Sequence, residues 1–545
     1  MMNDMKASND FVEIYINSEN SIPGKSTMPT LPRQPSPLNQ GLPKVETILT
    51  PSYSEIVQVA RKAFNRGTTK SLKFRIEQLH AMDRLFVENE HRFIEALQED
   101  MNKPKYEVIL MEIENTRNDI RCMLMNINKW SKPDFAEKSL VTLFDKTYIV
   151  KQPYGVVLVM GAWNYPVQLS IGPMVGAITA GNCVILKPSE VASATSNLFS
   201  ELIPRYLDQD CYHVVTGGVN ECNELLKERF DYIFFTGSVH TGQIVREAAN
   251  KYLTPVTLEL GGKSPVYLDN SVDFEISCKR LLWGKCTNLG QTCVAPDYLL
   301  CTPEIQDKFV NSAKKLLKEF YGEDPKSSPD LARIVNDKQF QRLIRLLKLS
   351  GNNVAIGGRI VEEERFIYPT ILTNVNASDP IMKEEIFGPI LPIITVKDHQ
   401  EAIKFINSRE KPLTLYIFST NKEVIENLIK NTCSGSVCVN DTIIHLAIDA
   451  LPFGGVGMSG MGRYHGKFSF DTFSHQKAVL ERNYNYVGEK MSEARYPPYS
   501  DAKIDYIRFM TKRRASIIPP YTGYILSFLF GVILVFVIQY MIDLF

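Results

Sequence analysis

The sequence has few of the residues that mark metal centres, disulfide frameworks or polyanion partners. Its 545 residues include 10 cysteines and 8 histidines, and no two cysteines have the C-x-x-C spacing of zinc and redox motifs. We therefore expect reduced thiols, as in the cytosol, and no metal. Basic and acidic residues balance at 61 each, which argues against nucleic acid as a partner.

The first residues of the chain also lack the pattern of a targeting segment. Residues 1–45 are polar and interrupted by prolines such as Pro29 and Pro32, which predicts a disordered leader. Acidic residues, among them Asp4 and Asp10, and the absence of an apolar run argue against a secretory or transit peptide.

The central part of the chain alternates between helical and extended patterns. Apolar residues recur at three- and four-residue spacing from Ser54 to Trp130. Buried-strand runs follow at Val156–Val159, Val184–Leu186 and Tyr232–Phe235, with helix-like segments between them. This order predicts an α/β fold with a doubly wound parallel sheet.

The same patterns suggest a division of the chain. After the leader, the predicted parts are N-terminal helices and a cofactor domain (46–256), with an oligomer-contact segment (133–154), then an α/β catalytic domain (257–440), a return to the cofactor domain and oligomer contact (441–490), a linker (491–520) and a transmembrane tail anchor (521–542).

The tail anchor is predicted from a run without charge. Tyr521 to Ile542 contains no Asp, Glu, Lys or Arg over 22 residues, enough to cross a hydrocarbon core of roughly 30 Å as a helix. The basic run Lys512–Arg514 precedes it, so the body of the protein is expected on the cytosolic side.

Two motifs indicate the chemistry. Cys293 lies in Asn-Leu-Gly-Gln-Thr-Cys-Val-Ala-Pro-Asp-Tyr, and Glu259 lies in Thr-Leu-Glu-Leu-Gly-Gly-Lys-Ser-Pro. A thiolate can attack a carbonyl while a carboxylate moves protons. Together the motifs resemble the aldehyde dehydrogenase superfamily, and the Ala-Pro-Asp-Tyr after the cysteine resembles its class 3, or fatty aldehyde, branch.

The resemblance implies roles for three catalytic residues. Cys293 is the nucleophile, and Glu259 is the base that activates water to hydrolyse the thioester. Its apolar neighbours are expected to raise its pKa toward a useful range. Asn164, in Gly-Ala-Trp-Asn-Tyr-Pro, would donate to the oxyanion together with the backbone N–H of Cys293.

Cofactor residues are less obvious. Gly455–Gly460 fits G-x-G-x-x-G by letter, but Pro452 and Phe453 lead into it, so the strand–turn–helix context is missing and we reject it. Gly237 and Ser238 instead follow a strand and open a helix, which suits a pyrophosphate.

The resemblance places the rest of the cofactor. Lys187 and Glu190 are expected at the adenosine ribose, Glu385 at the second ribose, and Phe387 beside the nicotinamide. The cofactor is NAD, with NADP as the alternative.

We therefore predict oxidation of long-chain or lipophilic aldehydes to carboxylic acids, through a cysteine thiohemiacetal and thioester. The resemblance implies a homodimer. The expected location of the tail anchor is the endoplasmic reticulum membrane or the mitochondrial outer membrane. Two alternatives stay open: a thioester-forming acyltransferase or reductase that releases no free acid, and an inactive membrane-tethered scaffold. The sequence does not identify the aldehyde.

Overall fold

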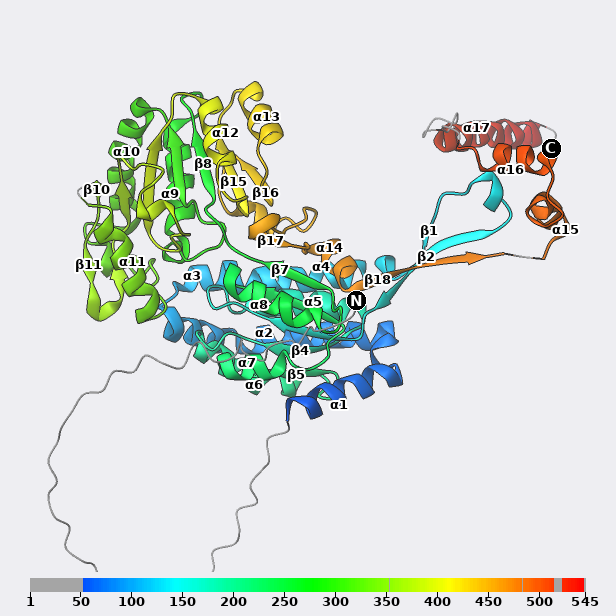
Figure 1. Ribbon diagram of the computed structural model, residues 1–545, viewed down its shortest axis with the longest axis horizontal. Coiled ribbons are helices and arrows are strands. Elements are labelled where there is room, and N and C mark those ends of the chain that lie inside the picture. The colour runs from blue at the N-terminus through cyan, green and yellow to red at the C-terminus, as the bar shows by residue number, and fades with distance from the viewer. Residues whose placement is uncertain (1–51, 352, 483, 514–521, 544–545) are drawn as a thin grey trace, which may run out of the picture. The chain divides into compact units, whose positions relative to one another are not determined.

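The computed structural model describes residues 52–351, 353–482, 484–513 and 522–543. The predicted leader lies outside these ranges. The described chain begins with helices (Figure 1). A capping box between Ser52 and Glu55 starts the first, which ends at Gly67 in the left-handed conformation. These helices are α1 (Tyr53–Arg66), α2 (Leu72–Met101), the single turn α3 (Lys105–Glu107), the π-helical segment η2 (Val108–Glu114) and α4 (Asn115–Trp130).

A six-stranded sheet follows, in the order β17-β7-β6-β3-β4-β5. Neighbouring strands from β3 to β7 are parallel. The chain moves outward from β3 to β5 and then restarts at β6 on the other side of β3, which is the doubly wound pattern predicted from the sequence. The strands are β3 (Val156–Met160), β4 (Cys183–Lys187), β5 (Tyr212–Val214), β6 (Tyr232–Thr236), β7 (Val256–Glu259) and β17 (Gly460–Met461).

Helices make the crossovers between these parallel strands. α5 is buried along its whole length, which explains its small and apolar sequence. Strands β3, β4 and β6 are also buried at every residue, as expected for a sheet covered on both faces. The helices are α5 (Gln168–Ala180), α6 (Ser193–Tyr206), α7 (Val219–Leu225) and α8 (Val239–Asn250).

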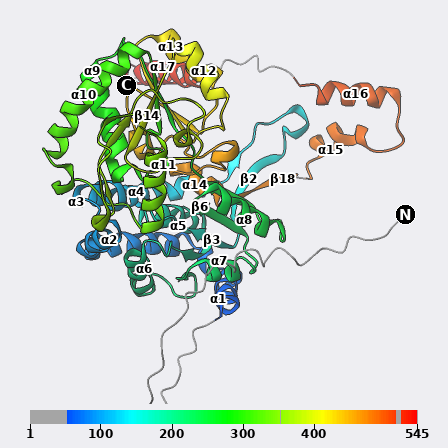
Figure 2. The same ribbon diagram turned by 60° about the vertical axis from the view of Figure 1, so that its left-hand side comes forward.

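A seven-stranded sheet carries the second hydrophobic core, in the order β10-β13-β14-β9-β8-β15-β16. Figure 2 labels its strand β14. The strand pairs of this sheet are parallel except at the edge, where β10 is antiparallel to β13. The strands are β8 (Pro265–Leu268), β9 (Tyr298–Cys301), β10 (Val354–Ile356), β13 (Thr370–Leu372), β14 (Ile390–Thr395), β15 (Thr414–Phe418) and β16 (Ser436–Val439), with the short hairpin β11 (Ile360–Val361) and β12 (Phe366–Ile367) beside them in the sequence.

The helices that follow these strands are amphipathic or buried. They are α9 (Phe274–Cys286), α10 (Pro303–Tyr321), α11 (Asp337–Leu349), α12 (His399–Asn407) and α13 (Lys422–Asn431). Because β7 still belongs to the first sheet, the chain enters the second one at Pro265 rather than at the predicted residue 257. The other predicted boundaries stay predictions.

A third, antiparallel sheet joins the predicted oligomer-contact segments. β2 (Lys146–Pro153) pairs along its length with β18 (Ser474–Glu481), and the short β1 (Asp134–Phe135) pairs with β2. α14 (Gly466–Thr472) leads into β18.

Three more helices end the described chain: α15 (Tyr486–Ser492), α16 (Asp501–Thr511) and α17 (Thr522–Asp543). Counting the described residues alone, no helix is long and apolar enough to cross a membrane. The predicted span 521–542 includes positions whose side chains are outside the described set near both ends.

Candidate active site

Cys293 lies on a strained turn between α9 and β9. The backbone before it has positive φ at three successive residues: Asn288 (51°), Leu289 (51°) and Gly290 (75°). Residues other than glycine held in this region cost about 1–3 kcal/mol each. The surrounding structure must therefore hold this turn in place.

Side-chain amides provide part of that support. The Asn288 side chain donates to the carbonyl of Asn164 (2.8 Å) and to that of Gln291 (3.0 Å). The amide of Asn164 donates in turn to the Gln291 carbonyl (3.1 Å), and the Gln291 side chain accepts from Val335 N (3.0 Å). The Asn164 side chain is therefore bound to the loop that carries Cys293, through the carbonyl of Gln291, two residues before the thiol.

Glu259 is the last residue of β7. Its side chain is 3% exposed, and neither carboxyl oxygen has a hydrogen-bond partner among the described residues. Burial raises the pKa of Glu259 well above its usual value, in the direction expected from its apolar neighbours. The segment 452–455 lies against it: a Cβ built on Gly454 would stand 3.1 Å from the Glu259 carboxyl oxygen.

The thiol itself is half-buried. Burial, together with the smaller effect of the carboxyl groups of Glu385 and Glu259, raises the pKa of Cys293 to about 12. This differs from the low pKa that a helix N-terminus or a cation would give a reactive thiol. The free thiol is therefore protonated at neutral pH, and attack on a carbonyl requires a base to take its proton.

Two predicted residues at the adenosine end lie at the carboxyl end of β4 and just after it. Lys187 ends this strand and is 3% exposed. Its ammonium group donates to the Pro188 carbonyl (2.8 Å) and to the Glu190 carboxylate (3.2 Å). A buried ammonium beside a half-exposed carboxylate presents a donor and an acceptor, which suits the two hydroxyls of a ribose.

The predicted phosphate turn follows β6. Ser238 caps α8 and accepts from Thr241 N (3.3 Å). A Cβ on Gly237 would stand 2.6 Å from the ring of Phe235, so the turn requires glycine. Because β6 and β4 flank β3 in the parallel sheet, this helix N-terminus and Lys187 lie along the same carboxyl edge. These residues fit a dinucleotide, and helix N–H groups are suited to its phosphates.

The predicted nicotinamide residues lie beside the reaction centre. The carboxyl group of Glu385 would overlap a Cβ on Gly261, so it sits against the turn that follows Glu259. Burial raises the pKa of Glu385 to about 8. The ring of Phe387 meets that of Trp163 edge-on at 5.3 Å, one residue before Asn164.

A buried ion pair supports the site and was not predicted from the sequence. Lys103 and Glu112 lie 2.5 Å apart and are both 0% exposed. Lys103 also donates to the Asn164 carbonyl (3.1 Å), while Glu112 accepts from Val167 N and Gln168 N (3.0 Å each). In the sequence these two residues look like charges on a helix surface, and no local motif distinguishes them.

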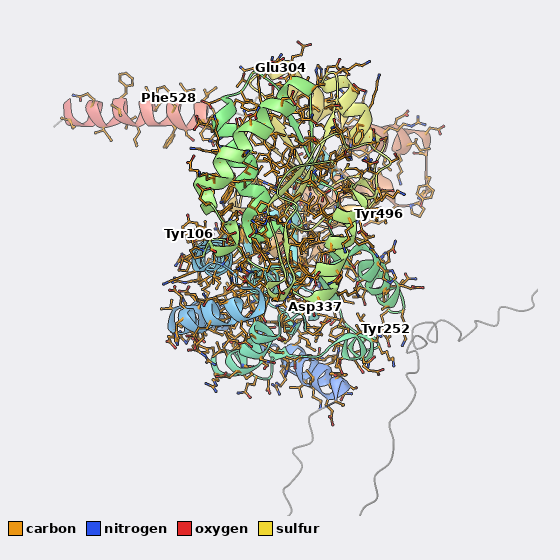
Figure 3. The ribbon with its side chains drawn as sticks, turned by 90° about the vertical axis from the view of Figure 1, so that its left-hand side faces the viewer. Tyr106, Tyr252, Glu304, Asp337, Tyr496 and Phe528 are labelled. Carbon is orange, nitrogen blue, oxygen red and sulfur yellow. The ribbon has the colours of Figure 1, made fainter. Side chains whose placement is uncertain are left out.

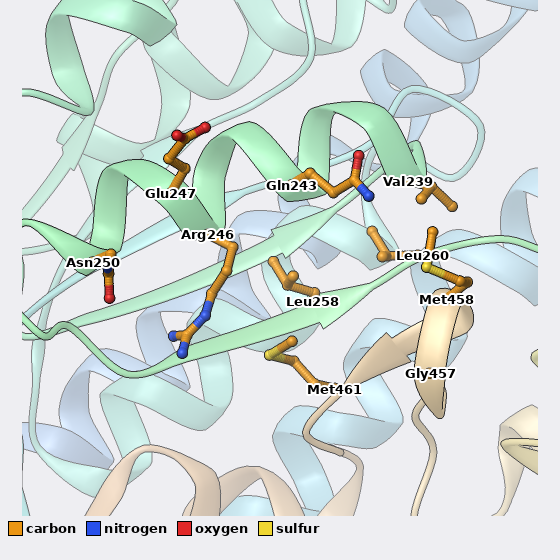
Figure 4. A pocket seen from close by; sticks show the side chains of 10 residues that line it. All are labelled: Val239, Gln243, Arg246, Glu247, Asn250, Leu258, Leu260, Gly457, Met458 and Met461. Atoms are coloured by element: carbon orange, nitrogen blue, oxygen red, sulfur yellow. The ribbon is translucent and has the colours of Figure 1, made fainter.

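A separate groove of about 410 Å³ lies between α8 and β7 (Figure 4). Its walls include Arg246 and Leu258, with Met458 and Met461 from the segment around β17. None of the predicted site residues lines it, so it is distinct from the catalytic constellation. The rejected glycine string 455–460 contributes to this wall and pairs with β7 through β17, which agrees with its rejection as a dinucleotide loop.

Comparison with known proteins bears on the chemistry of this constellation. The model of the aldehyde dehydrogenase family matches residues 34–479. The chain belongs to the aldehyde dehydrogenase family. A Mus musculus relative, aldehyde dehydrogenase family 3 member A2, is 49% identical over 449 residues, which are 82% of this chain and 92% of the relative.

Two further similarities agree. The Mus musculus protein named "Aldehyde dehydrogenase, dimeric NADP-preferring" is 51% identical over 453 residues, covering 83% of this chain and 99% of its own. The solved structure titled "Substrate bound state of Staphylococcus Aureus AldH" has a TM-score of 0.78 and 40% identity, and covers 88% of this chain and 100% of that one.

The resemblance to class 3 aldehyde dehydrogenases is therefore confirmed. This aldehyde dehydrogenase oxidises aldehydes to carboxylic acids with NAD(P). A thiol, a buried carboxyl group and a side-chain amide at one site are the groups this reaction requires.

Proposed function

We propose that this aldehyde dehydrogenase acts on long-chain or otherwise lipophilic aldehydes at a membrane surface, with Cys293 as nucleophile. The observation that carries the mechanism is that the Asn164 amide bonds to the loop of Cys293 while the buried carboxyl group of Glu259, at the end of β7, lies close enough to act on the thiol. The cofactor, when bound, accepts the hydride. The protein's own groups perform the proton transfers and stabilise the oxyanion.

The first step joins the thiol to the aldehyde. The Cys293 sulfur bonds to the carbonyl carbon as its proton passes to a carboxylate, and the carbonyl oxygen becomes the thiohemiacetal oxyanion. Glu259 and Glu385 are the acids whose charge acts on this thiol. Asn164 and the N–H of Cys293 stabilise the oxyanion, and one such donor is worth about 2.7–4 kcal/mol.

The second step releases the product. Loss of hydride from the thiohemiacetal leaves a thioester on Cys293. Glu259 takes a proton from water and the hydroxide adds to the thioester carbon. The C–S bond then breaks to give the acid and a thiolate, which takes the proton back from Glu259 to become the thiol. Because Glu259 must be ionised to act as a base and its pKa is raised, turnover is expected to increase with pH. Measuring kcat/KM across aldehyde chain lengths, with NAD and NADP in parallel, tests the substrate class.

NAD is expected to be preferred over NADP. The Glu190 carboxylate beside Lys187 would repel a 2′-phosphate while accepting from a ribose hydroxyl. We expect a higher kcat/KM with NAD, and Glu190→Gln should narrow the difference. Glu224→Gln, which changes an exposed acid paired with Lys227, is the matched control. A wild-type kcat/KM with NADP equal to or above that with NAD would refute the preference.

A homodimer is the proposed assembly. The name of the 51% identical relative describes that protein as dimeric, and the three-stranded sheet contains the segments predicted for oligomer contact. Light scattering on the purified protein tests it.

The C-terminal helix is the proposed anchor in the membrane of the endoplasmic reticulum or outer mitochondrion. α17 covers 22 residues. Its apolar side chains include Phe528, which is labelled in Figure 3, and Phe536, and both are 71% exposed. The basic residues Lys512 and Arg513 precede it, which supports a cytosolic catalytic body.

Truncation before Tyr521 is expected to release the enzyme from membranes without loss of activity on short aldehydes. The predicted catalytic and cofactor residues all precede this point. Efficiency toward long-chain aldehydes in vesicles should decrease, because an apolar substrate partitions into the bilayer where the anchored enzyme meets it. Fractionation of cells that express both forms, with assays of each fraction, is the measurement. Full-length protein that is already soluble, or that alkaline carbonate strips from membranes, would contradict the anchor.

A further inference from the structure

The strained turn before Cys293 has a second support outside its own loop. The backbone N–H of Asn288 donates to the carboxyl group of Glu107 at 2.9 Å. Glu107 ends the short helix α3, 181 residues earlier in the chain. Asn288 is the first of the three residues with positive φ. The contact therefore fixes the start of the left-handed run.

The same asparagine connects the turn to the proposed oxyanion donor. Its side chain donates to the Asn164 carbonyl, and the Asn164 amide donates back to the Gln291 carbonyl. A shift of Asn288 would therefore displace both the thiol loop and the Asn164 amide. Displacement of about 1 Å in a reacting geometry can cost about 100-fold in rate.

We propose that Glu107 is a positioning residue: its carboxylate holds the peptide of Asn288 and thereby sets the geometry between Cys293 and the oxyanion donor Asn164. The inference rests on the catalytic roles proposed above. It adds a residue that contacts neither the substrate nor the cofactor.

The charge of Glu107 decides how firmly it holds the turn. Burial raises the pKa of Glu107 to about 7, Asp330 and Glu112 act in the same direction, and Lys103 and the Asn288 N–H lower it. The other titratable groups that act on it are Tyr165, Tyr321 and Cys286. An ionised carboxylate makes a shorter and stronger bond to an N–H than a neutral acid. The turn is therefore held best above this pKa and loosens as the pH falls through it.

The test compares Glu107→Ala with Glu107→Gln. Alanine removes the acceptor, whereas glutamine keeps an acceptor oxygen that cannot titrate. The NADH burst rate, which reports acylation and hydride transfer, is measured from about pH 6 to about pH 9, with KM for NAD. Glu401→Gln is the matched control, because Glu401 also accepts a backbone N–H, from Lys397, but on an exposed helix end.

Glu107→Ala should lower the burst rate by about 10- to 100-fold with KM for NAD within about twofold of wild type. Glu107→Gln should recover most of the burst rate. The decrease of the burst rate that the wild type shows as the pH falls through about 7 should be missing from this variant. Glu401→Gln should match wild type. An unchanged burst rate in Glu107→Ala, or an unchanged acid limb in Glu107→Gln, would overturn the inference. Thermal unfolding and NADH binding separate a folding defect from misplacement. A wild-type enzyme without turnover would instead challenge the proposed function itself.

Discussion

Replacement of Cys293 with alanine is expected to abolish aldehyde-dependent NADH formation. The methyl group cannot form the thiohemiacetal, so no covalent intermediate exists from which hydride can leave. Fold and cofactor binding should persist, because the turn does not depend on the thiol: among the described residues, the Cys293 side chain has no hydrogen-bond partner in another side chain. The measurement is NADH absorbance with a lipophilic aldehyde, together with thermal unfolding and NADH binding.

The matched control is Cys433→Ala. Cys433 is an exposed free thiol, so its removal changes thiol content without touching the turn at 288–290. It should retain wild-type turnover. Aldehyde-dependent NADH formation by the Cys293→Ala enzyme above the uncatalysed background would sink the assignment of the nucleophile.

Glu259→Gln is expected to separate acylation from hydrolysis. The amide cannot take a proton from water, so the thioester should accumulate after one hydride transfer. A stopped-flow trace should show a burst of NADH and then steady turnover reduced by about 10²–10⁴-fold, the usual contribution of a positioned base. Intact-protein mass spectrometry should detect the acyl group on Cys293.

Glu99→Gln is a suitable control, because it changes an exposed acid on α2. It should leave both phases unchanged. If Glu259→Gln also kept wild-type rates in both phases, another group would be the base. If its burst were lost together with turnover, Glu259 would also be required to take the proton of Cys293, which would assign it both proton transfers.

The order of strands and helices could be predicted from the sequence, because each element depends on the pattern of apolar and polar residues at adjacent positions. The runs Val156–Val159 and Val184–Leu186 form strands β3 and β4 and are fully buried, as their apolar composition indicates. The glycine string 455–460 could be rejected for a local reason as well, because Pro452 and Phe453 lead into it and the strand–turn–helix context is missing. Cys293 and Glu259 were predicted from motifs of a few adjacent residues, whose residue types indicate the chemistry.

The supports of the site could not be predicted in this way. Glu107 meets Asn288 across 181 residues, and Lys103 meets Asn164 across 61. Such pairs depend on how segments far apart in the sequence pack together, which the spacing of apolar residues does not describe. The pKa of Cys293 illustrates the same limit, because burial and two acidic neighbours determine it, and none of these is visible beside the cysteine in the sequence.

The buried pair of Lys103 and Glu112 has a consequence for how this enzyme can change. Loss of either partner alone strands a charge in the interior, which typically costs about 3–5 kcal/mol, and it also frees the carbonyl of Asn164 or the N–H groups at the start of α5. Lys103 and Glu112, nine positions apart in the sequence, are therefore expected to change together and not one at a time. Variants in which only one of the two residues is replaced would therefore be unstable. Variants in which both are replaced together can keep the interior packed without a buried unpaired charge.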